Sequence, residues 1–220
     1  MYPFVRLAWQ FFIHRKTGKL AIGQTHYSTH YCLPWDLDLW RELNNGRTLS
    51  IYDMGRLPMA RRSGLLDVLK RKGWGLTIAG SSVRYRKRVR VFDKIEMRSR
   101  AICADARFLY LEQSMWVRGT CTGHALYRTA VTNADGIVPI ETLQAELNPN
   151  TPLPAIPEWV AAWITAEDLL PGRRCSTPIR KPLLWPCLSA TVKTVLGAPY
   201  VKTNTTAGHF NQTRARLDDV

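Results

Sequence analysis

The chain has 220 residues, of which 45% are hydrophobic and 10% aromatic, so it is long enough for one globular domain with additional segments. Its five cysteines are odd in number and have no C-x-x-C spacing, which excludes a disulfide framework and a zinc ribbon and favours a reducing, cytoplasmic compartment. The formal charge of +14 attracts polyanions in general, including nucleic acid, anionic membranes and phosphate-bearing ligands. Charge alone does not choose among these partners.

The first predicted element is an apolar helix over residues 2–14, followed by the basic run His14-Arg15-Lys16. A membrane span needs roughly 20 apolar residues, and this segment is shorter and contains Arg6. It lacks a small-residue cleavage site, so we do not expect a secretory signal. Two interpretations remain open: a helix packed on the domain surface, or an interfacial anchor that gives residues 2–16 peripheral membrane contact through Trp9 and Phe11.

A strand is predicted over residues 25–33, with His26, His30 and Cys32 on one face because strand side chains alternate. Three ligands spread along one strand are too far apart to converge on one ion. We therefore expect no metal site.

Acidic residues then precede a helix start. Asp36 and Asp38 are followed by Glu42 and by Asn44-Asn45-Gly46, directly before a helical pattern that runs to Leu69. Asparagine is a strong N-cap because its side-chain oxygen accepts free backbone N–H groups of the first turn. Those N–H groups can also hold a developing oxyanion, so the run has the layout of an active site.

Within the helical pattern, Pro58 removes a backbone donor and predicts a kink or division near residues 54–57. Gly64 predicts a second break. Lys70 to Gly75 then reads as a basic, glycine-bearing loop.

A strict alternation over residues 83–91 predicts a strand with one apolar face and one arginine face. The arginines are Arg84, Arg86, Arg88 and Arg90. Two interpretations of this face stay open. It is either a solvated outer face, or a phosphate site, since arginine pairs bidentately with phosphate oxygens.

Further strands are predicted over residues 95–103, 108–117 and 120–131, with turns between them, and short helices over 139–147 and 156–170. His124 falls in the middle of a strand, where a lone histidine is usually a satisfied structural group. From residue 172 the chain is basic and without sustained periodicity, which predicts a disordered tail. The chain has no P-loop, dinucleotide fingerprint or G-x-S-x-G motif.

The run from Asp36 to Arg56 resembles the hotdog-fold acyl-CoA thioesterases of the 4-hydroxybenzoyl-CoA thioesterase type, and among them the THEM6-like branch. The matching positions are Asp36, Asp38, Glu42, Asn44, Asn45, Thr48, Asp53 and Arg56, with Glu42 and Thr48 in place of the usual His and Tyr. The segment from Tyr85 to Asp93 resembles the family's strand-turn-strand signature, with Arg88 for the usual Pro and Phe92 for the usual Gly. Together the matches cover about residues 26 to 131.

The resemblance implies an α+β hotdog fold, in which a curved antiparallel sheet wraps around a long central helix. We expect an N-terminal amphipathic helix (1–21), the hotdog domain (22–148), a proline-rich segment with a short helix (149–171) and the basic tail (172–220). The resemblance also implies a homodimer or a dimer of dimers, with sites built from both chains.

The implied activity is hydrolysis of an acyl-CoA thioester, with coenzyme A as part of the substrate and no separate cofactor. The leading candidate carboxylate, acting as nucleophile or general base, is Asp38, and Glu42 and Asp53 compete for the role. The implied oxyanion and substrate contacts are Asn44, Asn45, Gly46, Arg47, Thr48 and Arg56, and the coenzyme A phosphates would meet Arg84, Arg86, Arg88 and Arg90.

Two alternatives remain open. The atypical Glu42 and Thr48 favour a non-catalytic acyl-CoA or acyl-carrier binding protein of the same fold. A nucleic-acid or anionic-membrane binder ranks last, because the sequence shows no aromatic stacking motif and no base-reading helix.

Overall fold

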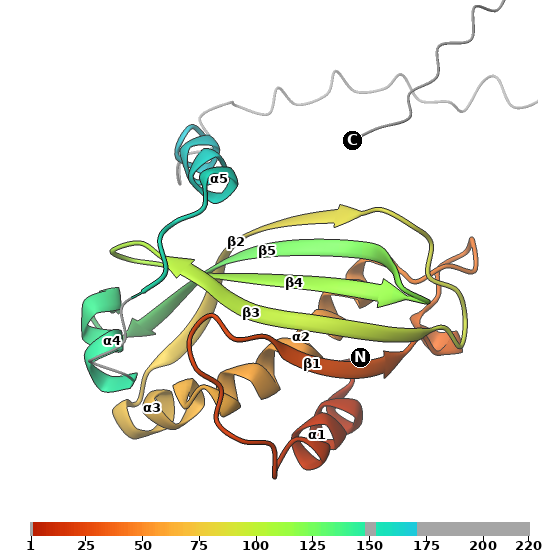
Figure 1. Cartoon of the computed structure of the whole chain (residues 1–220), viewed down its shortest axis with the longest axis horizontal. Helices are drawn as coiled ribbons and strands as arrows, with labels where there is room; N and C mark the ends of the chain where they lie inside the picture. The colour runs from red at the N-terminus through yellow and green to blue at the C-terminus, as the bar shows by residue number, and fades with distance from the viewer. Residues whose placement is uncertain (1, 148–152, 171–220) are drawn as a thin grey trace, which may run out of the picture. The chain divides into compact units, whose positions relative to one another are not determined.

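One antiparallel sheet organises the chain in the computed structural model, which describes residues 2–147 and 153–170 (Figure 1). Its strands are β1 (His26–Tyr31), β2 (Gly75–Tyr85), β3 (Lys94–Ala104), β4 (Leu109–Val117), β5 (Thr120–Asn133) and β6 (Gly136–Ile137). The strand order is β1-β3-β4-β5-β2, and β6 pairs with β5. β1 and β2 are therefore the two edges of the main sheet.

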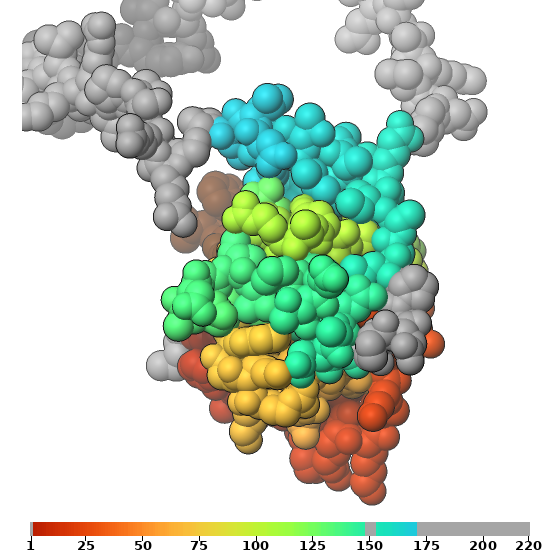
Figure 2. Space-filling model, turned by 90° about the vertical axis from the view of Figure 1, so that its left-hand side faces the viewer, coloured from red at the N-terminus to blue at the C-terminus, as the bar shows by residue number. Residues whose placement is uncertain are grey.

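Helices cover both faces of this sheet. They are α1 (Phe4–Ile13), α2 (Asn45–Arg62), α3 (Leu65–Lys72), α4 (Ile140–Leu147) and α5 (Glu158–Asp168), with a short 3-10 turn η1 (Pro34–Asp36) before α2. In Figure 1 the curved sheet has α1, α2 and α3 on one side and α5 on the other. In Figure 2 the blue α5 and the yellow α3 are separated by green and teal segments of the chain.

The alternation of side chains along β4 explains why both faces are covered. Leu111 and Met115 are buried in the core around α2, whereas Tyr110 is buried in a separate cluster with Val160 of α5. Successive strand residues point to opposite faces, so a strand apolar on both faces needs cover on both. The predicted fold, a curved antiparallel sheet around a central helix, is confirmed.

The central helix lies close to the sheet at Gly55. A Cβ atom at this position would overlap the Met97 sulfur and lie 3.0 Å from Ser99 Oγ on β3. Beside it, buried Gln113 of β4 donates hydrogen bonds to the Tyr52 carbonyl at 2.9 Å and to Ser99 Oγ at 2.8 Å. The absence of a side chain at Gly55 lets the helix backbone reach this polar contact.

Two predictions about the central helix have different outcomes. The sequence predicted a kink or a division near residues 54–57. A division is wrong, because α2 runs unbroken from Asn45 to Arg62, and the kink stays a prediction. Most residues around Pro58 are buried, and tertiary packing stabilises a helix that has lost one backbone donor. The predicted break at Gly64 is confirmed: its φ of +80° suits glycine and separates α2 from α3. α3 extends to Lys72, so the first half of the predicted 70–75 loop is helical instead.

The predicted strand over residues 83–91 is also wrong. β2 begins earlier, at Gly75, and ends at Tyr85, so only Arg84 of the four arginines lies in a strand. The amides of Arg86 and Lys87 both donate to the Thr122 carbonyl, which ends the regular ladder. Residues 86–90, here called the basic loop, are irregular apart from one isolated bridge at Arg90.

Most other predicted elements are confirmed within a few residues, including the N-terminal helix, the strand at 25–33, the later strands and the two C-terminal helices. His26 and His30 share the buried face of β1, and buried Cys32 follows it. Burial lowers the pKa of each histidine to about 3, so both stay neutral. The proposed segment boundaries remain predictions, and the predicted tail 172–220 lies outside the described residues.

We expect Gly55→Ala to lower the free energy of unfolding by about 1–3 kcal/mol, because the new methyl group overlaps the buried Met97 side chain. Helix propensity alone predicts the opposite sign, since alanine in a helix interior is better than glycine by about 0.5–1 kcal/mol. Gly18→Ala is the matched control, because a Cβ there meets nothing within 4 Å. Urea denaturation measures both variants, and a Gly55→Ala protein as stable as the parent contradicts the close contact.

Candidate active site at the start of the central helix

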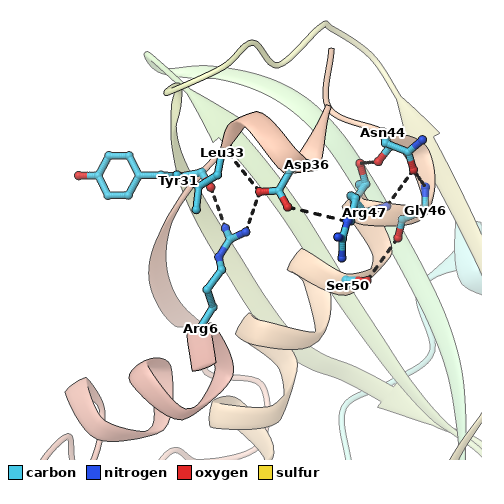
Figure 3. Close-up of polar contacts among 9 residues, drawn as sticks. Arg6, Tyr31, Leu33, Asp36, Asn44, Gly46, Arg47 and Ser50 are labelled. Carbon is cyan, nitrogen blue, oxygen red and sulfur yellow. Dashed lines mark hydrogen bonds and ion pairs between the residues drawn. The ribbon is translucent and has the colours of Figure 1, made fainter. Parts of the chain in front are cut away.

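A buried carboxylate fastens the segment that leads into α2. Asp36 is 2% exposed, and its Oδ2 accepts hydrogen bonds from Arg6 Nη1 at 2.6 Å and from the Leu33 amide at 3.1 Å (Figure 3). Arg47 Nε approaches Oδ1 at 4.0 Å, and the Asp36 carbonyl accepts the Asn44 amide at 2.9 Å. Asp36 thus ties α1, the end of β1 and the start of α2 together.

The helix start itself is capped as predicted. Asn44 is the N-cap, and its Oδ1 accepts the amides of Gly46 at 2.8 Å and Arg47 at 3.2 Å (Figure 3). Thr48 Oγ1 donates to the Asn44 carbonyl at 3.1 Å. Two of the amides expected as oxyanion donors are therefore already bound to Asn44. Among the described residues, the Asn45 amide has no acceptor and is the donor left for a ligand.

Asp38 forms a closed turn with the residues that follow it. Its Oδ1 accepts the amides of Trp40 at 2.8 Å and Glu42 at 3.2 Å, while its own amide donates to the Glu42 carbonyl at 2.8 Å. Such side-chain-to-backbone bonds are typical of aspartate in turns. Asp38 is half-buried, and it does not line the cavity described next. Asp38 therefore contacts the backbone of Glu42, and Glu42 is the residue that lines the cavity.

A cavity of about 240 Å³, here called the helix-start cavity, opens beside this turn. Glu42, Leu43, Asn45 and Thr48 line one side of it, the segment Tyr85–Val89 lines another, and Met115, Thr122 and Gly123 complete it. Its two walls are joined by a hydrogen bond of 2.9 Å from the Leu43 amide to the Val89 carbonyl, and by the bridge between Glu42 and Arg90. This backbone pairing brings a carboxylate and the basic loop to one cavity.

The basic loop separates the helix-start cavity from a second hollow of about 700 Å³, here called the basic hollow. Arg86, Lys87 and Arg88 line both spaces, and Arg90 and Arg118 line only the basic hollow. Arg88 Nε lies 3.0 Å from Glu42 Oε1, although the Arg88 side chain is 75% exposed. Arg84, on β2, lines neither space, so the structure brings three of the four predicted arginines together and leaves Arg84 apart.

Asp53 and Arg56 belong to a different part of α2. They form an ion pair with each other, and Arg56 Nη1 also donates to Gln113 Oε1 at 3.3 Å. The Arg56 guanidinium carbon lies 4.2 Å from the centre of the Tyr127 ring. Arg56 is 7% exposed, and neither residue lines the helix-start cavity. Their contacts are those of a structural group between the helix and the sheet.

Tyr85 and Gly123 line the cavity, although neither was among the predicted site residues. Tyr85 Oη donates to the Asn45 carbonyl at 3.4 Å, which links β2 to the first residue of α2. Gly123 belongs to the cavity wall, and a Cβ there would lie 3.1 Å from Tyr52 Oη. The place of Tyr85 at the start of the Tyr85–Asp93 segment could have indicated a site residue. For Gly123, a glycine inside a strand, no neighbouring sequence feature predicts a role in a cavity wall.

His124 lies on the face of the sheet that α5 covers. Its Nε2 is 2.9 Å from Glu112 Oε1, and its ring packs edge-on against Trp159 of α5 with centroids 5.9 Å apart. The hydrogen bond from His124, together with Arg100, lowers the pKa of Glu112 against the opposing effect of burial. His124 is thus a satisfied structural group, as expected.

Replacing Asp36 tests whether its buried carboxylate stabilises the fold. Asp36→Asn should lower the free energy of unfolding by about 2–3 kcal/mol, because Arg6 and Arg47 lose their anionic partner in a buried setting. Glu96→Gln is the control, since it breaks an exposed pair with Lys94 and should cost less than about 0.5 kcal/mol. Chemical denaturation followed by circular dichroism compares the two. Equal costs would show that Asp36 is dispensable for the fold.

Comparisons with known proteins bear on the family and the fold of the chain. The model of the thioesterase-like superfamily matches residues 32–164. The Xenopus laevis protein THEM6 is 29% identical over 143 residues, which cover 65% of this chain and 69% of THEM6. The crystal structure of YbaW, a probable thioesterase from Escherichia coli, superposes with a TM-score of 0.53 at 15% identity over 56% of this chain and 96% of that one.

A further solved structure is Slr0204, a 1,4-dihydroxy-2-naphthoyl-CoA thioesterase from Synechocystis, with a TM-score of 0.50 and 12% identity over 59% of this chain and all of that chain. At such identities the two structures bear on the fold, and they agree with the curved sheet around α2. The family match covers more than half of the sequence and supports a thioester hydrolase. The chain belongs to the thioesterase-like superfamily and has the hotdog fold predicted from its sequence.

Proposed function

We propose that this protein is an acyl-CoA thioesterase whose reaction takes place in the helix-start cavity. The observation that carries the proposal is the convergence on one cavity of a carboxylate (Glu42), a helix-terminal amide (Asn45) and a loop of three cations (Arg86, Lys87 and Arg88). Thioester hydrolysis needs a base near the carbonyl carbon, a donor near its oxygen and a site for the anionic coenzyme. The cavity contains one of each.

In this proposal Glu42 acts on the thioester as general base, and Asp38 positions it. Asp38 binds the backbone of Glu42 at both N–H and C=O, whereas the Glu42 side chain itself lines the cavity. A water held by Glu42 would attack the carbonyl carbon, and the proton would pass to the carboxylate as the thiolate of coenzyme A leaves. The Asn45 amide, at the positive end of α2, would stabilise the developing oxyanion.

The phosphates of coenzyme A would occupy the basic hollow on the other side of the loop. Arg86, Lys87 and Arg88 border both spaces, so a ligand that crosses the loop can place its thioester in one and its phosphates in the other. Guanidinium groups bind phosphate oxygens through paired hydrogen bonds. This arrangement assigns the phosphate-binding role to the basic loop and not to Arg84.

The proposal includes a homodimer joined through β2. This strand has 11 residues and, among the described residues, pairs only with β5, so one edge of its backbone is open. Open edges of this length promote pairing with another strand, and pairing with a second β2 would satisfy them. The helix-start cavity lies at the Tyr85 end of β2, close to such an interface.

A non-catalytic acyl-CoA binding protein is the second candidate, and two contacts favour it. Asn44 already occupies the amides of Gly46 and Arg47, and Arg88 already pairs with Glu42. If both contacts persist with ligand bound, the cavity binds a thioester without activating water. Tight binding of acyl-CoA with no turnover by the parent protein would select this function.

Substituting the two neighbouring carboxylates separates their roles. Glu42→Gln should lower kcat at least about a hundredfold, because it removes the base. Asp38→Asn keeps an oxygen that accepts the Trp40 and Glu42 amides, so kcat should fall by less than about tenfold. Thioester hydrolysis is measured with short, aromatic and long acyl-CoA substrates. A collapse of kcat in Asp38→Asn with normal turnover by Glu42→Gln would reverse the assignment.

Neutralising the basic loop tests the phosphate site. Arg86→Gln combined with Lys87→Gln should raise KM for acyl-CoA about tenfold or more with little change in kcat, because charge-assisted contacts to the distal phosphates are lost. The matched control is an acyl-pantetheine substrate, which lacks those phosphates and should react equally with parent and variant. A similar loss on both substrates would assign the loop to the fold or the thioester instead.

A further inference from the structure

The N-terminal helix packs on the domain with its polar side. Gln10 is the only buried residue of α1, and its Nε2 donates to the Thr29 carbonyl of β1 at 3.2 Å. Arg6 donates to Asp36 at 2.6 Å and to the Tyr31 carbonyl at 2.7 Å. These polar contacts, with partly buried Leu7 and Phe11 beside them, attach α1 to the rest of the fold.

The opposite side of α1 is apolar and exposed. The exposed fractions are 69% for Phe4, 85% for Val5, 58% for Trp9, 52% for Phe12 and 41% for Ile13, and Ala8 is exposed as well. At about 100° per residue these six positions follow one another around half of the helix circumference, with no charged residue among them. The Trp9 and Phe12 rings stack with centroids 5.6 Å apart. The surface formed by these six residues is here called the α1 face.

This orientation is the reverse of a normal surface helix, which buries its apolar side. Contiguous exposed apolar patches on folded proteins mark sites of interaction with another protein or with a membrane. The residues that follow α1 decide between these partners. Arg15, Lys16 and Lys19 are all exposed, and the Arg15 guanidinium carbon lies 3.7 Å from the centre of the Phe12 ring. Cations are therefore next to the apolar rings.

We propose that the α1 face docks on an anionic lipid surface. The apolar side chains would enter the boundary between headgroups and acyl chains, and Arg15, Lys16 and Lys19 would meet the anionic headgroups. Tryptophan suits this depth, because its ring is apolar and its N–H is polar. In the part of the chain that the structure describes, no helix is long and apolar enough to traverse a bilayer. In this proposal α1 would lie in the plane of the membrane surface.

The orientation of α1 links this docking to the candidate active site. Arg6 points away from the α1 face to Asp36, which in turn approaches Arg47 in the first turn of α2. A membrane-bound α1 would hold the helix-start cavity at a defined distance from the lipid. Docking is nevertheless independent of hydrolysis, since none of the residues of the α1 face lines that cavity.

Vesicle co-sedimentation of the full chain tests the proposal. The parent protein should bind vesicles of phosphatidylcholine with phosphatidylserine more tightly than vesicles of phosphatidylcholine alone. Trp9→Ser combined with Phe12→Ser should weaken binding about tenfold or more, because two inserted rings are lost. Trp159→Ser is the matched control: it removes a similarly exposed tryptophan on α5, and its binding should equal that of the parent. Replacing Arg15, Lys16 and Lys19 with glutamine should weaken binding to the anionic vesicles about fivefold per charge.

Three results would overturn the proposal. The parent protein could fail to bind either vesicle, or the Trp9→Ser, Phe12→Ser variant could bind as well as the parent, which would assign binding to charges elsewhere in the chain. Light scattering could also show that this variant forms a smaller oligomer than the parent, which would make the α1 face a contact between copies of the chain. Acyl-CoA hydrolysis by the double variant should match the parent, so a failure of the membrane proposal and a failure of the thioesterase proposal give different results.

Discussion

The hydrogen bonds of the buried Asp36 carboxylate position the functional end of the molecule. A carboxylate that is 2% exposed needs cationic and amide partners, and it finds them on three separate elements: α1, the residues after β1, and the first turn of α2. The Asp38–Glu42 turn lies directly between these anchored points. The position of this turn, and with it the direction of the Glu42 side chain, therefore depends on Asp36, which does not line the cavity.

The parts of the fold that were predictable from the sequence are those decided by local chemistry. Asn44 caps α2 because the acceptor and its donors are two and three residues apart, and Gly64 breaks the helix because its own φ requires it. The failures have non-local causes. Pro58 is tolerated because buried neighbours hold α2 together, and β2 ends at Tyr85 because Thr122, on β5, accepts the next two amides. The alternation of Val and Arg residues in the sequence does not indicate where the distant Thr122 carbonyl lies.

The stretch of sequence that contributes to the candidate site was predictable, but the arrangement of its side chains was not. Glu42 of the acidic run lines one cavity together with Asn45 and Thr48 of the helix start, whereas Asp36 and Asp38 do not line it. The sequence could not show which carboxylate reaches the cavity, because Asp38 and Glu42 are separated by a turn in which Arg41 has a φ of +59°. The sequence predicted the Asn44 cap and also assigned the Gly46 and Arg47 amides to the oxyanion, although a capping side chain and an oxyanion compete for the same donors. Asp53 and Arg56 matched a family pattern, yet Arg56 also contacts Gln113 and Tyr127, which come from the sheet.

The contact between Glu42 and Arg88 connects binding with catalysis in the proposed mechanism. Arg88 Nε lies 3.0 Å from Glu42 Oε1, so this ion pair engages the carboxylate that would hold the attacking water. Arg88 is largely exposed and borders the basic hollow, so a phosphate group there competes with Glu42 for the same guanidinium. In the proposed mechanism, a phosphate that binds Arg88 would leave the Glu42 carboxylate free to accept a hydrogen bond from the attacking water. In this proposal, a substrate that carries phosphates would release the Glu42 base by binding Arg88. Without such a substrate, the Glu42–Arg88 ion pair would stay formed.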